Sequence, residues 1–119
     1  MSQICVVGIY VPELEKAIAF YRDILGFEVE KEYGKTIVSL KHGDLPLILE
    51  QSNEAKIKSE NGVSGVVLTF STTDINETLQ YLNSKDVDVL STEPEDCPPG
   101  KFIRFKDPFG NILEYLQFV

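Results

Sequence analysis

Hydrophobic and polar positions along the chain follow an order of one strand, one helix and three strands, and this order occurs twice. In the first half, β-branched and apolar residues from Ile4 to Val11 predict a strand, which Pro12 ends. The apolar positions of the following helix recur three or four residues apart, at Leu14, Ala17, Ile18, Tyr21 and Leu25. Short apolar or alternating runs then predict strands over residues 27–33, 36–40 and 45–51.

The same order of elements returns in the second half. A β-type run over residues 63–70 is followed by Asp74 and, three residues on, Glu77, a spacing that resembles a helix capping box. Apolar residues at helical spacing follow at Ile75, Leu79 and Leu82. Further strands are predicted over residues 87–90, 102–105 and 112–118, and the proline-rich segment 93–100 is predicted to be a loop.

A turn and an internal repeat complete the pattern. The last two predicted strands are joined by Asp107-Pro108-Phe109-Gly110, which has the residue types of a type I turn. Residues 6–14 (VVGIYVPEL) can be laid over residues 67–75 (VLTFSTTDI), and Ile-Leu-Glu occurs at both 48–50 and 112–114. We therefore predict an α+β fold of two βαβββ modules. The first covers about residues 1–52 and the second about residues 63–119, with a polar linker over about 53–62.

Composition narrows the class of protein. With 119 residues we expect a single domain over residues 1–119. The formal net charge of −8, with no cluster of lysines and arginines, disfavours nucleic acid as a partner. No apolar run approaches the roughly 20 residues that cross a bilayer, and the N-terminus does not resemble a signal peptide. Two cysteines, Cys5 and Cys97, do not form a disulfide framework, and we expect Cys5 to be a buried thiol. These features predict a cytoplasmic protein without membrane partners.

Two segments carry a family resemblance. In residues 10–27 (YVPELEKAIAFYRDILGF), acidic residues and a leucine at the start of the predicted helix are followed by Phe-Tyr and then by Leu-Gly-Phe. Residues 104–114 (RFKDPFGNILE) contain Asp-Pro-x-Gly-Asn. Both resemble the vicinal-oxygen-chelate superfamily, which contains glyoxalase I, the extradiol dioxygenases and the bleomycin-resistance proteins. The resemblance implies that the modules form an incomplete eight-stranded barrel around a cavity, with the helices outside. It also implies a homodimer, in which modules pair either within one chain or across the dimer.

The resemblance places a set of side chains on the cavity side. Because side chains alternate along a strand, Val6, Gly8 and Tyr10 would face the cavity while the residues between them face the helices. The candidate ligand-binding residues are Val6, Gly8, Tyr10, Glu50, Val67, Thr69, Glu114 and Leu116.

Metal-dependent members of this superfamily carry ligands on the first and last strands of each module. The matching first-strand positions here are Val6 and Val67, which have no lone pair to donate to a metal. The last-strand positions are Glu114, placed by the Asp-Pro-x-Gly-Asn turn, and Glu50, which would turn outward if its strand shifted by one residue. His42, the only histidine, lies in a predicted turn and is interpreted as a surface residue. We therefore expect no metal, no other cofactor and no catalytic residue.

The leading hypothesis from the sequence is a metal-free protein, resembling the bleomycin-resistance branch, that sequesters or carries a small molecule in the cavity. The acidic net charge makes a cationic ligand one option. The alternative is a metal-dependent lyase or isomerase resembling glyoxalase I (lactoylglutathione lyase), in which a divalent metal polarises substrate oxygens. A third option is a domain without a ligand that serves in dimerisation or regulation. Val6 and Val67 argue against metal-dependent catalysis but leave open whether the protein is an enzyme.

Overall fold

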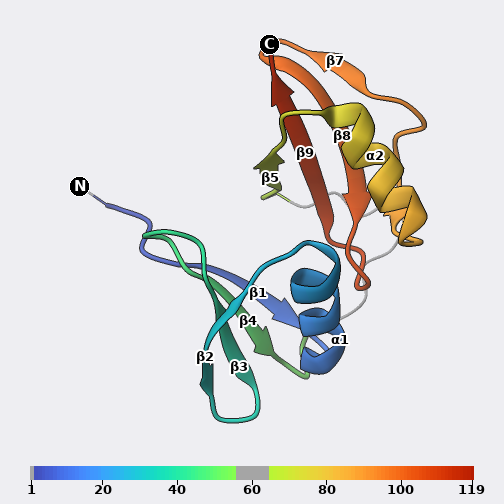
Figure 1. Ribbon diagram of the computed structural model, residues 1–119. Helices are drawn as coiled ribbons and strands as arrows, with labels where there is room; N and C mark the ends of the chain where they lie inside the picture. Colours follow the sequence, from blue (N-terminus) through green and yellow to red (C-terminus); the bar gives the residue numbers. More distant parts are fainter. Residues whose placement is uncertain (1, 56–64) are drawn as a thin grey trace. The chain divides into compact units, whose positions relative to one another are not determined.

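The computed structural model of the chain describes residues 2–55 and 65–119 (Figure 1). The chain divides into two compact units, Met1–Ile57 and Lys58–Val119. This division falls in the predicted linker. Residues 56–62 of that linker lie outside the described part of the chain. The first two residues of the strand predicted over 63–70 also lie outside it.

The first unit contains one sheet with a helical segment between its first two strands. Its elements are β1 (Val7–Val11), α1 (Leu14–Ile18), the π-helix η1 (Ala19–Ile24), β2 (Val29–Tyr33), β3 (Ile37–Leu40) and β4 (Leu47–Gln51). The strand order is β1-β4-β3-β2, with β1 parallel to β4 and the other neighbours antiparallel. The first and last strands of the unit therefore lie side by side.

The second unit repeats this arrangement with one additional short strand. Its elements are β5 (Leu68–Ser71), α2 (Ile75–Ser84), β6 (Asp88–Val89), β7 (Glu95–Cys97), β8 (Gly100–Lys106) and β9 (Ile112–Phe118). The strand order is β5-β9-β8-β6, with β7 also paired to β8, and β5 runs parallel to β9. Again the first and last strands of the unit are neighbours.

In each unit the helical segment covers one face of the sheet. In the first unit α1 packs against β4, and the buried residues include Val11, Leu14, Ala17, Tyr21, Leu47 and Leu49. In the second unit α2 packs against β6, β8 and β9 (Figure 1), and the buried residues include Ile75, Leu79, Leu82, Ile103, Phe105 and Leu113. Burying these apolar side chains against the sheet stabilises each unit. Residues at the alternate strand positions point to the other face, where the candidate site lies.

The first predicted helix is only partly an α-helix. Ala17 N donates to Glu13 O, four residues back, whereas Leu25 N donates to Phe20 O, five residues back, both at 3.1 Å. A π-type turn is wider than an α-turn, so it shifts which side chains face the sheet. Phe20 is 5% exposed, although the spacing of three and four residues had left it out of the apolar stripe. Ile18 and Leu25, which that spacing included, are only half-buried.

Two local predictions are wrong. The segment 93–100, predicted to be a loop, contains β7, which pairs with β8 as a hairpin around Pro98 and Pro99. The prolines occupy the turn, where their restricted φ is suitable, and so they do not prevent the strand. Cys5 is exposed rather than buried, because β1 begins at Val7 and not at Ile4.

The predicted helix start and closing turn are both present. Asp74 accepts a hydrogen bond from Glu77 N at 3.1 Å, and Gly110 N donates to Asp107 O at 3.1 Å. The chain is thus an α+β protein with two βαβββ modules, the second carrying the extra strand β7. The eight-stranded barrel stays a prediction about how the two sheets combine. None of the described helices is long and apolar enough to span a membrane.

Candidate functional site

The first module places several predicted cavity residues on the sheet face opposite α1. Gly8 and Tyr10 alternate along β1 with more buried residues, and Tyr10 lies opposite Glu50 on β4. Leu49, next to Glu50, is fully buried on the helix side, so Glu50 is not turned toward the core. Tyr10 is 66% exposed and Val6, immediately before β1, is 48% exposed. This face therefore presents an aromatic ring, a carboxylate and an aliphatic group.

The second module aligns three polar side chains across adjacent strands. Thr69 on β5 lies opposite Glu114 on β9, and Glu114 lies opposite Arg104 on β8. Residues that are opposite one another in a sheet point to the same face. Thr69, Glu114 and Arg104 thus form a row, here called the polar row, on the face opposite α2.

Glu114 is the central residue of the polar row and is held on both sides. Thr69 Oγ1 donates to Glu114 Oε1 at 3.1 Å, and Arg104 Nε lies 4.0 Å from Glu114 Oε2. The side chain of Glu114 is 27% exposed and that of Arg104 is 42% exposed. The positive guanidinium of Arg104 partly offsets the negative charge of Glu114 across this exposed ion pair.

Apolar side chains continue the same face beyond the polar row. Leu116 follows Glu114 by two residues on β9 and lies opposite Phe102 on β8 and Ser71 on β5. Val67, immediately before β5, is 39% exposed. Leu116, Thr69, Glu114 and Val67 are the predicted cavity residues of this module. Arg104, Phe102 and Ser71 are additional residues that the candidate set lacked.

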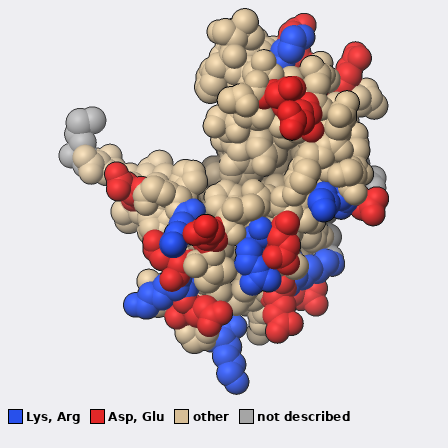
Figure 2. Space-filling model, viewed as in Figure 1, with Lys and Arg blue, Asp and Glu red and all other residues tan. Residues whose placement is uncertain are grey.

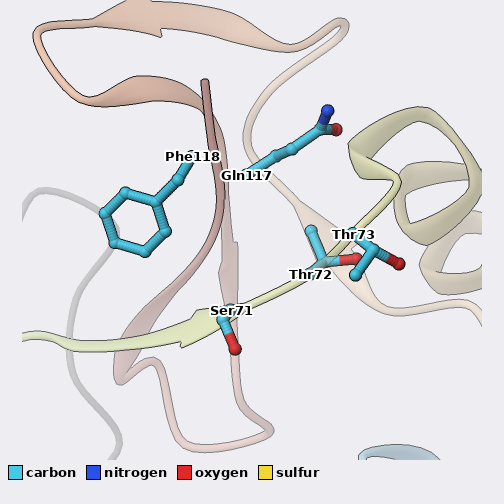
Figure 3. Close-up of a pocket in the computed structure, with 5 residues that line it drawn as sticks. All are labelled: Ser71, Thr72, Thr73, Gln117 and Phe118. Atoms are coloured by element: carbon cyan, nitrogen blue, oxygen red, sulfur yellow. The ribbon is translucent and has the colours of Figure 1, made fainter.

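A groove of about 700 Å³ lies at the end of this face. It is lined by Ser71, Thr72, Thr73, Gln117 and Phe118 (Figure 3). Figure 3 shows Gln117 and Phe118, neighbours on β9, extending to opposite sides of the strand. Phe118 is 67% exposed, whereas the Gln117 side-chain oxygen accepts a hydrogen bond from Ile75 N at 2.8 Å. The groove was not predicted, although the run of hydroxyl residues after an apolar strand was a usable signal.

A second hollow of about 290 Å³ lies near the start of α2. Its lining includes Asp74, Glu77, Thr78, Tyr81 and Tyr115. Burial raises the pKa of Tyr115, and the nearby Tyr81 raises it further. Tyr115 is therefore a neutral phenol at neutral pH. This hollow is on the helix side of the sheet and does not include Glu114, so we do not assign it to the candidate site.

The donors available to a divalent metal are few within each module. Each module supplies one carboxylate from its last strand, Glu50 or Glu114, while Val6 and Val67 offer only hydrocarbon. His42 is exposed, and its Nδ1 is 3.1 Å from Leu45 O. Among residues 2–55 and 65–119, no three His, Cys, Asp or Glu gather where they could hold a metal ion. Structural and catalytic metal sites use several nitrogen, oxygen or sulfur ligands, so the described donors of either module alone do not complete one.

Two βαβββ modules, each with a glutamate on its last strand, define the architectural class of this protein. The chain belongs to the Glyoxalase/Bleomycin resistance protein/Dioxygenase superfamily, whose family model matches residues 3–115. Membership of this superfamily confirms the resemblance found in the sequence. Because the fold carries different activities, the function still depends on the site.

Curated relatives in this superfamily have different activities. The chain is 30% identical over 105 residues to the metallothiol transferase FosB of Staphylococcus epidermidis, covering 87% of this chain and 75% of that protein. It is 31% identical over 125 residues to human mitochondrial methylmalonyl-CoA epimerase, covering 93% and 71%. It is 32% identical over 112 residues to a manganese-dependent 2,3-dihydroxybiphenyl 1,2-dioxygenase of Geobacillus genomosp. 3, covering 91% and 34%.

Solved structures share the fold over nearly the whole chain. A glyoxalase family protein from Enterococcus faecalis has a TM-score of 0.79 and 26% identity, with 96% of both chains covered. TnmS3, an antibiotic binding protein from Streptomyces sp. CB03234, has a TM-score of 0.76 and 22% identity, covering 100% of this chain and 98% of that one.

The relatives correct the expectation that the protein uses no metal. That expectation rested on two positions, Val6 and Val67. The FosB metallothiol transferases and the manganese-dependent dioxygenase are named for a metal, and the chain is 30% and 32% identical to members of these two groups. Ligands of a metal site converge from several elements, so two aliphatic positions are too narrow a basis for excluding a metal.

Proposed function

We propose that this protein binds a small organic molecule on the polar-row face of the second module and sequesters or carries it. The observation that carries the proposal is Glu114, a half-buried carboxylate held by Thr69 at 3.1 Å and compensated by Arg104, beside the apolar Leu116. Small-molecule sites combine apolar lining with a few positioned polar groups. Thr69 orients the Glu114 carboxylate, while Leu116 and Val67 supply apolar contact.

The first module carries a corresponding set of residues on its own sheet. Gly8, Tyr10 and Glu50 lie on the corresponding face of its sheet, with Val6 at the edge. In the described part of the chain, no hydrogen-bond donor reaches the Glu50 carboxylate, so it can accept one from a ligand. A solved protein of the same fold, TnmS3, is an antibiotic binding protein, which supports small-molecule binding by this architecture. A cationic ligand stays a prediction, and Arg104 beside Glu114 weakens the reason for it.

The proposal is tested with a neutral amphiphilic probe, 4-phenylbutan-1-ol, followed by amide NMR shifts. We expect saturable shifts concentrated on β5, β8 and β9, and about a tenfold weaker affinity in Leu116→Gln, because the apolar contact is lost. Tyr81→Gln is the matched control, since Tyr81 is 42% exposed on α2, and its affinity should equal that of the wild type. Shifts scattered over the whole surface, or no saturation, would contradict a site on this face.

A second candidate function is an enzyme of the transferase, epimerase or lyase type. The observation that favours it is the 30–31% identity to a metallothiol transferase and to methylmalonyl-CoA epimerase. Elemental analysis of protein purified without chelator separates the two candidates. A stoichiometric transition metal would favour the enzyme over the carrier. A homodimer and a cytoplasmic location stay predictions under both candidates.

A further inference from the structure

We propose that the polar-row site recognises an organic acid, whose anionic group binds Arg104 while its apolar part packs on Leu116 and Phe102. This inference rests on the proposed function and names its ligand class. It differs from the cationic ligand that the net charge had suggested, because it follows from the local arrangement of side chains and not from the total charge.

Arg104 has hydrogen-bonding capacity that the protein does not use. Its Nε is 4.0 Å from Glu114 Oε2, which is an ion pair but lies beyond the roughly 2.7–3.2 Å of a hydrogen bond. Among the described residues, no acceptor forms a hydrogen bond with the Arg104 guanidinium. A guanidinium presents several N–H groups in a planar fork that matches a carboxylate, phosphate or phosphonate. Its side chain is 42% exposed, so a ligand can reach it.

Glu114 orients the Arg104 guanidinium without using its hydrogen-bonding capacity. Thr69 Oγ1 holds one carboxylate oxygen at 3.1 Å, which leaves the other oxygen on the side of Arg104. The register also keeps the two side chains on one face, because Arg104 and Glu114 are directly opposite across β8 and β9. A guanidinium that is already positioned loses less conformational entropy when it binds an anion.

The residues next to the polar row match the rest of an amphiphilic acid. Leu116 and Phe102 lie opposite each other one step further along the same face, and both are half-buried. Phe118 lies two residues beyond Leu116 at the groove and is 67% exposed. An anionic group at Arg104 therefore leaves the apolar part of a ligand over hydrocarbon and aromatic surface. Burial of that surface contributes affinity.

The overall charge does not override this local pattern. The chain carries a formal net charge of −8. Figure 2 shows lysines and arginines interspersed with the acidic residues on the face in view, rather than one continuous acidic surface. Exposed charges further apart than a Debye length are largely screened at physiological ionic strength, so a direct contact with Arg104 decides the preference.

The test uses four probes with one phenylbutyl body and different head groups: 4-phenylbutyrate, 4-phenylbutylamine, 4-phenylbutan-1-ol and the zwitterion homophenylalanine. We expect the wild type to bind 4-phenylbutyrate most tightly in calorimetric or NMR titrations. In Arg104→Gln its affinity should fall about tenfold or more, since a charge-assisted hydrogen bond is lost, while affinity for the alcohol stays unchanged. The affinity of Arg104→Lys for 4-phenylbutyrate should lie between those of the wild type and Arg104→Gln, because lysine keeps the charge without the planar fork.

Lys101→Gln is the matched control. Lys101 is on the same strand, its removal changes the net charge equally, and its ammonium pairs with Asp96 at 3.0 Å away from the polar row. Affinity for 4-phenylbutyrate should be unchanged in this variant. Equal or tighter binding of 4-phenylbutylamine, or equal losses for acid and alcohol in Arg104→Gln, overturns the organic-acid inference and leaves the proposed binding function standing. Failure of all four probes to bind overturns both. If Arg104→Gln does not fold, Arg104→Lys is compared instead, and its loss of affinity for 4-phenylbutyrate should be smaller but should still exceed its loss for the alcohol.

Discussion

At the scale of single residues, Asp107 determines the geometry of the closing hairpin. The residue is 4% exposed, and its Oδ1 accepts hydrogen bonds from Phe109 N at 2.9 Å and Asn111 N at 2.8 Å. Oδ2 accepts from the Asn111 side-chain amide at 2.8 Å. One buried carboxylate thus satisfies three donors of the turn between β8 and β9. This turn sets the register that places Arg104 opposite Glu114.

We expect Asp107→Ala to lower the free energy of unfolding by about 2–4 kcal/mol, because three donors lose a charged acceptor in a buried turn. Urea unfolding followed by circular dichroism measures the change. Asp23→Ala is the control, since Asp23 is exposed and in the described chain pairs only with its neighbour Arg22, so the loss in this variant should be much smaller than in Asp107→Ala. A loss below about 1 kcal/mol in Asp107→Ala would show that water replaces the carboxylate.

The sequence could predict part of this residue-scale picture. The type I turn at Asp107 and the helix cap at Asp74 were recognised because the residues themselves form the local hydrogen bonds. Cys5 was predicted wrongly, because the start of β1 depends on pairing with β4, which no local pattern records. The pairing of Arg104 with Glu114 required the strand register on both sides of the turn.

At the scale of elements, a glutamine from the last strand of each module holds the start of that module's helical segment. Gln51 Oε1 on β4 accepts a hydrogen bond from Leu14 N at 2.9 Å, and Gln117 Oε1 on β9 accepts one from Ile75 N at 2.8 Å. The first N–H groups of a helix lack partners within the helix, so each glutamine acts as a cap from another element. These contacts connect helix and sheet at corresponding places of the two modules.

We expect Gln51→Ala and Gln117→Ala each to lower the free energy of unfolding by about 1 kcal/mol, the usual cost of losing a cap. Thermal or urea unfolding measures both. Gln80→Ala is the matched control, because Gln80 is an exposed residue within α2 and alanine is a better helix former there. An equal loss in Gln80→Ala would mean that the effect comes from the substitution type and not from the cap.

The elements also show where sequence patterns stop being sufficient. Most strands and both helix positions followed from hydrophobic spacing, because burial against one sheet face imposes that spacing. The π-helix η1 changed the period within a helix, so Phe20 is buried although it lies outside the stripe that the three-and-four spacing defined. The strand β7 was missed because its own residues carry no apolar pattern and its pairing to β8 decides its structure.

At the scale of the whole molecule, both sheets carry exposed apolar side chains. Tyr10 is 66% exposed and Val6 is 48% exposed in the first module, and Phe118 is 67% exposed in the second. Single exposed apolar residues are common, so it is the family resemblance that connects these side chains with an interface. The family resemblance implies a homodimer, which would cover such residues.

We therefore expect sedimentation velocity to give a dimer, with twice the 13.4 kDa chain mass, over a hundredfold dilution series. Tyr10→Glu should shift the equilibrium toward monomer at the lower concentrations, because a buried carboxylate without a partner opposes association. Tyr81→Glu, an equal change on α2, should leave the dimer unchanged, since that side chain is on the helix rather than on the sheet face. A wild-type monomer at every concentration would contradict the dimer.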